Sequence, residues 1–310
     1  KDLVKVWETE TLQLQSEINS NRGFHGVLWT PGGELIVGDN RNNVFSSSVN
    51  NVGKKIVESS GLGFRLRWFA LSPDGSRLML PSDSTNSIFV RNLRDKTFIQ
   101  FNPRTLSPTA GIFHPDGKTL VLFGENLRPQ LSLGDSRQNG LVELWSISEN
   151  QVKFSGSIIL KDRVESVAVH PNGEMLAAGL YSGLSSSKIE LWNIKNRENP
   201  VCFKKLGLHK NSVAGLAFTP DGRFLFSAGD INGTLLAKEE EKYDRLGVWS
   251  MADISASRNA CASPITKPRE SFNCEQYGGC NRIAISHDGS RWLFSKGREG
   301  RLALEIIFYR

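Results

Sequence analysis

The 310-residue sequence lacks most features that would indicate a membrane protein or a common enzyme class. No apolar run approaches the roughly 20 residues that a membrane-spanning helix needs. The motifs GxSxG, GxxxxGK[ST] and HExxH are absent, so nothing indicates the hydrolases, P-loop enzymes or zinc proteases that carry them. The 38 Lys and Arg are dispersed among 32 Asp and Glu, and the net charge of +6 therefore favours an ordinary solvated surface.

Cysteine is also scarce, and the sequence has only Cys202, Cys261, Cys274 and Cys280. There is no CxxC pair, so neither a zinc site nor any other metal or cofactor is predicted. Cys274 and Cys280 lie close enough in sequence for a disulfide if the protein is exported. We favour the alternative, in which the thiols are reduced in a cytoplasmic protein. The chain starts at Lys1 without a secretory signal, which favours a piece of a longer protein.

What the sequence does contain is a tight turn that recurs along the whole chain. Each turn ends in a glycine, and an apolar strand precedes and follows each one. The turn glycines are Gly33, Gly75, Gly117, Gly173, Gly222 and Gly289. The first two intervals between them are equal, and the later three are longer, as expected for one repeating unit with insertions. Asp or Asn before the glycine bonds to the local backbone, and glycine accepts a positive φ. A period of roughly 40–45 residues is typical of a four-stranded propeller blade.

Tryptophans provide a second landmark. The segments LVKVW, LVELW, KIELW and LGVW end at Trp7, Trp145, Trp192 and Trp249. In the shortest unit, Ser72–Val90, the turn glycine is Gly75 and the third strand ends at Val90. Trp145, Trp192 and Trp249 each lie farther from the turn glycine before them than Val90 lies from Gly75. These larger distances in sequence predict insertions between the second and third strands of three successive units. The insertions before Trp145 and Trp249 are longer than the one before Trp192.

Together these segments resemble the WD-repeat β-propeller family: a strand, an SPDG-type turn, a small-residue strand, a loop and an apolar strand ending in Trp. The resemblance covers nearly all of residues 1–310 and implies a single all-β propeller of four-stranded antiparallel blades. Six or seven blades fit, and seven are favoured in the parent protein. The sequence departs from the family because no Trp is followed by Asp. The resemblance assigns a buried structural network to His209, Ser227, Asp244 and Trp249.

The insertions give the main indication of function. The loops 124–140, 179–189 and 229–245 are expected on one face, and lengthened loops on one face commonly form a binding surface. The residues ten and eight positions before each turn glycine are expected to line the central entrance of the propeller on that face. The candidate binding residues from this entrance and from the loops are His25, Arg65, Arg67, Arg163, Glu165, Asn281, Arg128, Arg137, Tyr181 and Tyr243.

The favoured function is a non-catalytic, monomeric scaffold that binds a protein or peptide on the inserted face and needs neither a membrane nor nucleic acid. The alternative is a phosphate-rich ligand or nucleic acid bound by the arginines at the entrance. A propeller enzyme ranks third, because no cluster of three or more His, Asp or Glu occurs at the strand entrances. The histidines His114, His170 and His287 occupy turns of separate blades, and we expect them to be structural.

Overall fold

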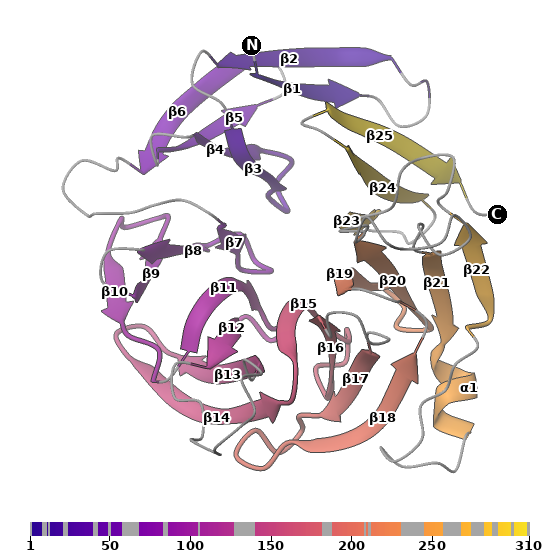
Figure 1. Cartoon of the computed structure of the whole chain (residues 1–310). Coiled ribbons are helices and arrows are strands. Elements are labelled where there is room, and N and C mark those ends of the chain that lie inside the picture. The colour runs from indigo at the N-terminus through magenta and orange to yellow at the C-terminus, as the bar shows by residue number, and fades with distance from the viewer. Residues whose placement is uncertain are drawn as a thin grey trace. The chain divides into compact units, whose positions relative to one another are not determined.

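A computed structural model of the chain describes residues 2–7, 11, 13–20, 24–39, 43–48, 51–57, 68–82, 86–104, 106–126, 140–181, 188–207, 209, 212–230, 245–256, 268–273, 282–286, 291–298 and 301–308. These residues form strands β1–β25 and one short helix, α1 (Met251–Ala256) (Figure 1). By contacts, the chain divides into two compact units, one comprising Lys1–Leu122 with Leu144–Phe154 and the other Phe123–Glu143 with Ser155–Arg310.

Five sets of four strands follow the predicted order, with consecutive strands paired side by side (Figure 1). We call them blades 1 to 5. Blade 1 is β3 (Phe24–Trp29), β4 (Leu35–Asp39), β5 (Val44–Ser48) and β6 (Asn51–Val57). Blade 2 is β7 (Ala70–Leu71), β8 (Arg77–Ser82), β9 (Ser87–Asn92) and β10 (Phe98–Phe101). Blade 3 is β11 (Leu106–Phe113), β12 (Thr119–Asn126), β13 (Gly140–Ile147) and β14 (Val152–Leu160).

Blade 4 is β15 (Arg163–Val169), β16 (Met175–Tyr181), β17 (Lys188–Asn193) and β18 (Val201–Gly207). Blade 5 is β19 (Ser212–Phe218), β20 (Phe224–Asp230), β21 (Arg245–Ser250) and β22 (Glu270–Asn273). A single residue pair, Tyr181 with Ser212, joins these two blades into one eight-stranded sheet.

Two smaller sheets lie at the ends of the sequence. The first is β1 (Asp2–Trp7) with β2 (Leu14–Ser20), and the second is β23 (Arg282–Ile285), β24 (Arg291–Arg298) and β25 (Arg301–Phe308). The all-β propeller architecture is therefore confirmed, and the number of blades stays a prediction.

The turn chemistry read from the sequence is present at five of the six glycines, and Gly289 lies outside the described residues. In each turn, the glycine N–H donates to the carbonyl three residues earlier, at 2.8–3.0 Å. The glycine φ angles lie between +64° and +78°, a left-handed conformation that side chains disfavour. These turns fix the register of the first and second strands in blades 1 to 5.

The second strands are buried along most of their length, because they are packed on both faces. All five residues of β4 are buried, and Leu120, Val121 and Leu122 of β12 are fully inaccessible. Such strands read as continuous apolar runs rather than as alternating patterns. The core thus lies between sheets packed face to face and holds the strand ends in place.

Two features differ from the sequence-based expectations. Helix α1 directly follows Trp249 and Ser250, in a chain that was expected to be all-β. Cys202 in β18 is disulfide-bonded, which corrects the favoured interpretation of reduced thiols. The other three cysteines, and with them the alternative Cys274–Cys280 pair, lie outside the described residues.

Candidate interaction site

The three lengthened loops begin and end at the same edge of the second unit. Their stems are the last residues of β12, β16 and β20 and the first residues of β13, β17 and β21. Tyr181, which ends β16, pairs with both Arg163 and Ser212 at the starts of β15 and β19. Ser212 pairs in turn with Asp230, which ends β20. The stems of the second and third loops are therefore neighbours.

The stem of the first loop joins the same edge through blade 3. Glu125 near the end of β12 forms an ion pair with Arg163, with Nη1 and Oε1 3.4 Å apart. A Cβ on Gly140 would lie 2.2 Å from the carbonyl oxygen of Asp162, so β13 starts in close contact with the segment before β15. We call this edge the loop rim and define it by Glu125, Gly140, Arg163, Tyr181 and Ser212.

Arg163 is the centre of the loop rim. Its Nε donates to Glu165 Oε1 at 2.6 Å, and its Nη2 contacts the same oxygen. Its guanidinium lies over the ring of Tyr181, 5.2 Å from the centroid. Burial disfavours the charge, but the carboxylates of Glu165 and Glu125 outweigh it and raise the pKa of Arg163. The cluster therefore has one cation held between two anions, and its net charge is negative.

Tyr181 provides the exposed apolar surface of this cluster. Its side chain is 41% accessible. The stacked guanidinium and the strand backbone limit the positions that the ring can take. Arg163, Glu165 and Tyr181 are thus brought together as candidate binding residues.

Glu125 was not singled out by sequence reasoning, although it lies inside the predicted 124–140 loop. The sequence feature that could have identified Glu125 is its position at the end of a second strand, from which its side chain can reach the next blade. His25 lies in β3, but its side chain lies outside the described residues. The remaining binding candidates, all beyond the described residues, are Arg65, Arg67, Arg128, Arg137, Tyr243 and Asn281.

The network assigned to blade 5 by resemblance has three of its four members in contact. His209 Nε2 and Ser227 Oγ are 2.9 Å apart, and Trp249 Nε1 donates to the same Oγ at 2.9 Å. All three side chains are buried, while Asp244 lies outside the described residues. A catalytic serine must be reachable by its substrate and by an activating base. The buried Ser227 hydroxyl, which accepts from an indole, acts instead as a link between strands.

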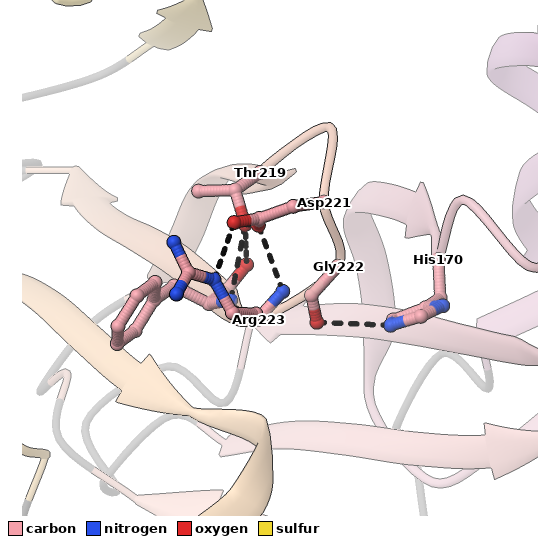
Figure 2. A network of polar contacts seen from close by, with 6 residues as sticks. His170, Thr219, Asp221, Gly222 and Arg223 are labelled. Atoms are coloured by element: carbon pink, nitrogen blue, oxygen red, sulfur yellow. Dashed lines mark hydrogen bonds and ion pairs between the residues drawn. The ribbon is translucent and has the colours of Figure 1, made fainter. Parts of the chain in front are cut away.

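The turn histidines also hold the structure together. His170 Nδ1 accepts from the Asn172 N–H, so Nε2 carries the proton and donates to the Gly222 carbonyl at 2.9 Å (Figure 2). The turn of blade 4 is thereby bonded to the turn of blade 5. In blade 3, His114 Nδ1 accepts from the Asp116 N–H at 3.1 Å. His287 lies outside the described residues.

The turn of blade 5 contains a carboxylate held by several donors (Figure 2). Thr219 Oγ1 donates to Asp221 Oδ1 at 2.6 Å, and the Arg223 N–H and Nε donate at 3.0 and 2.5 Å. The Thr219 hydroxyl and these further donors lower the pKa of Asp221 to about 2. Asp221 therefore stabilises the turn in its ionised form.

Within the described ranges, no group of three or more His, Cys, Asp or Glu could hold a metal ion. No helix in that part of the chain is both long and apolar enough to cross a bilayer.

Comparisons with known proteins agree with this architecture. A family model described as WD domain, G-beta repeat, matches residues 200–235. Human cilia- and flagella-associated protein 52 is 31% identical over 105 residues, which are 33% of this chain and 14% of that protein. The chain therefore spans only a small part of that relative.

Solved structures match almost the whole chain. The β-propeller domain of Myceliophteria thermophila Cps50 (Swd1) matches with a TM-score of 0.64 and 15% identity, over 93% of this chain and 83% of that one. Hydrazine synthase from Kuenenia stuttgartiensis matches with a TM-score of 0.68 and 15% identity, over 99% and 89%. At this identity the two structures establish the fold alone.

The class of protein is thus a β-propeller, and the resemblance to the WD-repeat β-propeller family is confirmed. The segment that the family model recognises covers β18 of blade 4 and β19 and β20 of blade 5. WD-repeat propellers generally serve as protein-interaction scaffolds and are generally non-catalytic.

Proposed function

We propose that the chain is a non-catalytic, monomeric scaffold that binds a protein or peptide at the loop rim. The observation that carries the proposal is the exposed Tyr181 ring, held by Arg163 where the stems of the loops 124–140, 179–189 and 229–245 meet. Tyr and Arg are enriched among the residues that dominate binding at protein interfaces. The three loops would extend the contact around this centre.

The ion pairs of Arg163 count against the alternative of a phosphate-rich ligand. A free guanidinium fork binds phosphate well, but this one already donates to Glu165 and Glu125. An anion would have to displace two carboxylates and then lie beside them. We therefore favour a protein or peptide partner, and a basic or neutral contact surface suits the net negative cluster.

The proposal is tested by quantitative affinity capture with the wild-type chain and three sets of variants. Tyr181→Ser removes the ring, Glu125→Ala with Glu165→Ala releases Arg163, and deletions of residues 128–138 or 232–242 shorten the loops. Partners of the loop rim should be depleted at least tenfold by Tyr181→Ser, in keeping with the loss of an aromatic anchor.

Val201→Ser is the matched control, because Val201 is an exposed apolar residue of β18 that pairs with Asn193, at the end of β17 opposite the loop stem. Its partners should equal those of the wild type. Partners that survive Tyr181→Ser and both deletions would rule out the loop rim. The anionic-ligand alternative would instead be supported if a partner bound more tightly to the Glu125→Ala, Glu165→Ala double variant and if 0.5 M salt abolished that binding.

A further inference from the structure

Two arginines lie over a single phenylalanine ring at the turn end of blade 5. The guanidinium carbon of Arg223 is 6.0 Å from the centroid of the Phe224 ring, and that of Arg269 is 5.6 Å from the same centroid. Both arginines are exposed, while Phe224 is half-buried. All three residues belong to the second unit. We call them the arginine cluster.

Backbone hydrogen bonds hold the arginine cluster together. Phe224 is the first residue of β20, and Arg223 directly precedes it. The Arg223 carbonyl accepts from the N–H of Met251, which directly follows β21, at 2.9 Å. The Arg269 N–H donates to the carbonyl of Val248 in β21, also at 2.9 Å. The two arginines, which are far apart in sequence, are therefore fixed beside the same ring by the strands of one blade.

The two guanidinium groups differ in what they already bind. Arg223 Nε donates to Asp221 Oδ2 at 2.5 Å (Figure 2). Among the residues that the structure describes, the Arg269 guanidinium has no hydrogen-bond acceptor or carboxylate, and its contact is the stacking on Phe224. An arginine that stacks on a ring keeps its forked N–H donors available for a carboxylate or a phosphate. Arg269 therefore has the donors that a partner could use, and Arg223 has part of them.

Blade 4 has the same turn but a different arrangement of charge. Its residues equivalent to Arg223 and Phe224 are Glu174 and Met175, and none of blades 1 to 4 has an aromatic residue two positions after its turn glycine. Glu174 forms an ion pair with Lys195, with Oε1 and Nζ 2.9 Å apart. In blade 5, by contrast, two arginines share the single carboxylate of Asp221. The arginine cluster with Asp221 thus has a net positive charge, opposite in sign to the cluster around Arg163.

We propose that the arginine cluster is an interaction surface that binds an acidic peptide segment of a partner protein through two carboxylates. One carboxylate accepts from the forked donors of Arg269, and the other accepts from the Nη groups of Arg223. Phe224 begins β20, whereas Asp230, which pairs with Ser212 of the loop rim, ends the same strand. The arginine cluster is therefore separated from the loop rim by the length of β20, and this inference is independent of the proposed function.

Spacing and charge favour peptide carboxylates over phosphate. Side chains two positions apart in an extended peptide lie on one side, about 7 Å from one another. This spacing suits two guanidinium groups that lie within 6.0 Å of one ring centroid. The Thr219 hydroxyl and further donors lower the pKa of Asp221 to about 2, so Asp221 is ionised at neutral pH. Its charge repels a phosphate dianion more strongly than a carboxylate.

Fluorescence anisotropy tests the proposal with a labelled decapeptide that alternates Glu and Ser. The same peptide with Gln in place of Glu is the control ligand, and a labelled uridine decamer represents nucleic acid. At low ionic strength, where charge pairs are least screened, the chain should bind the Glu peptide at least tenfold more tightly than the Gln peptide. Inorganic phosphate should displace the Glu peptide no better than chloride does at equal ionic strength.

Four variants locate the binding. Arg269→Gln should weaken binding of the Glu peptide at least tenfold, and Arg223→Gln should weaken it less, because Arg223 already donates to Asp221. Asp221→Asn should strengthen binding, because it removes the competing carboxylate. Arg94→Gln is the matched control, since Arg94 is an exposed arginine in the turn between β9 and β10, and its affinity should stay within twofold of the wild type. Circular dichroism verifies that each variant is folded.

Three results would overturn the proposal. Equal affinity for the Glu and Gln peptides would mean that carboxylates are not recognised. Equal losses in Arg269→Gln and Arg94→Gln would mean that only the overall charge of the chain attracts the peptide. Tighter binding of the uridine decamer than of the Glu peptide, with a loss in Arg269→Gln, would make nucleic acid the ligand of this surface.

Discussion

Blades 4 and 5 have the same strand order and the same turn, but they hold their tryptophans differently. In blade 5, Trp249 donates to Ser227, which also contacts His209. In blade 4, the positions equivalent to Ser227 and His209 are Ala178 and Leu160, counted from the turn glycines. The buried Trp192 Nε1 accordingly has no hydrogen-bond partner in the described residues.

The blade fold therefore does not depend on this network. Apolar packing and the glycine turn are present in both blades, and these suffice to form four paired strands. The network adds two buried hydrogen bonds where it occurs. The family model matches residues 200–235, which include His209 and Ser227 of this network.

The largest expected difference between the blades is in the cost of losing the tryptophan. Trp249→Ala should lower the free energy of unfolding by about 3–5 kcal/mol, because it empties a fully buried site. Trp192→Ala should cost less, because that side chain is partly exposed and its N–H loses no partner. Urea denaturation of both variants gives the comparison. Equal losses would show that the network contributes nothing.

A second difference is the disulfide at Cys202, on the outer strand of blade 4. Cys202→Ser should destabilise the chain by about 2–4 kcal/mol, because the unfolded chain loses a cross-link. Thermal unfolding with and without dithiothreitol measures the effect, and non-reducing peptide mapping identifies the partner cysteine. On reduction, the unfolding temperature of the wild type should fall more than that of Cys202→Ser. The absence of any difference between them would contradict the disulfide.

The third prediction concerns the histidine of the blade 5 network. His209→Ala should cost about 1–3 kcal/mol, because it removes a partner of a buried hydroxyl. Ser227→Ala and the double variant complete a double-mutant cycle. The two side chains are in contact, so a coupling energy of about 0.5–3 kcal/mol is expected. Strictly additive losses would mean that the two residues act independently.

A fourth prediction tests the bond between the turns of the two blades. Gly222→Ala would place a Cβ 2.4 Å from His170 Nε2, whereas a Cβ on Gly33 meets nothing within 4 Å. Both glycines have φ above +70°, so the two substitutions cause similar backbone strain. Gly222→Ala should therefore be less stable than Gly33→Ala by about 1 kcal/mol, the approximate value of the displaced hydrogen bond. Chemical denaturation of the two variants, alone and with His170→Ala, measures it. In the His170→Ala background the difference should disappear.

The sequence predicts the repeating parts of this molecule well, because turns and strand periods are local. Gly173 and Gly222 require a positive φ, and each apolar run beside them requires a strand. The pairing of Glu125 with Arg163 was not predictable, because it depends on how blade 3 packs against blade 4. The partner of Cys202 could not be predicted either, because spacing alone does not determine disulfide connectivity.

The smallest expected difference concerns acid stability of the two turns. Asn172 in blade 4 accepts from the Glu174 N–H without a charge, while Asp221 accepts from the Arg223 N–H as an anion. The pKa of Asp221 is lowered to about 2 from 3.8, with the Thr219 hydrogen bond as the largest cause. Its contribution is therefore complete above about pH 4 and is lost as the pH falls through about 2.

Asp221→Asn should consequently be less stable than wild type at pH 6, and the two should converge near pH 2. The difference should stay below about 1 kcal/mol, because Asp221 is exposed and solvent screens its interactions. Urea midpoints of both proteins between pH 2 and pH 6 measure it, and Asn172→Asp offers the reciprocal change in blade 4. A difference that persists unchanged at pH 2 would show that the side-chain shape of Asp221, and not its charge, holds the turn.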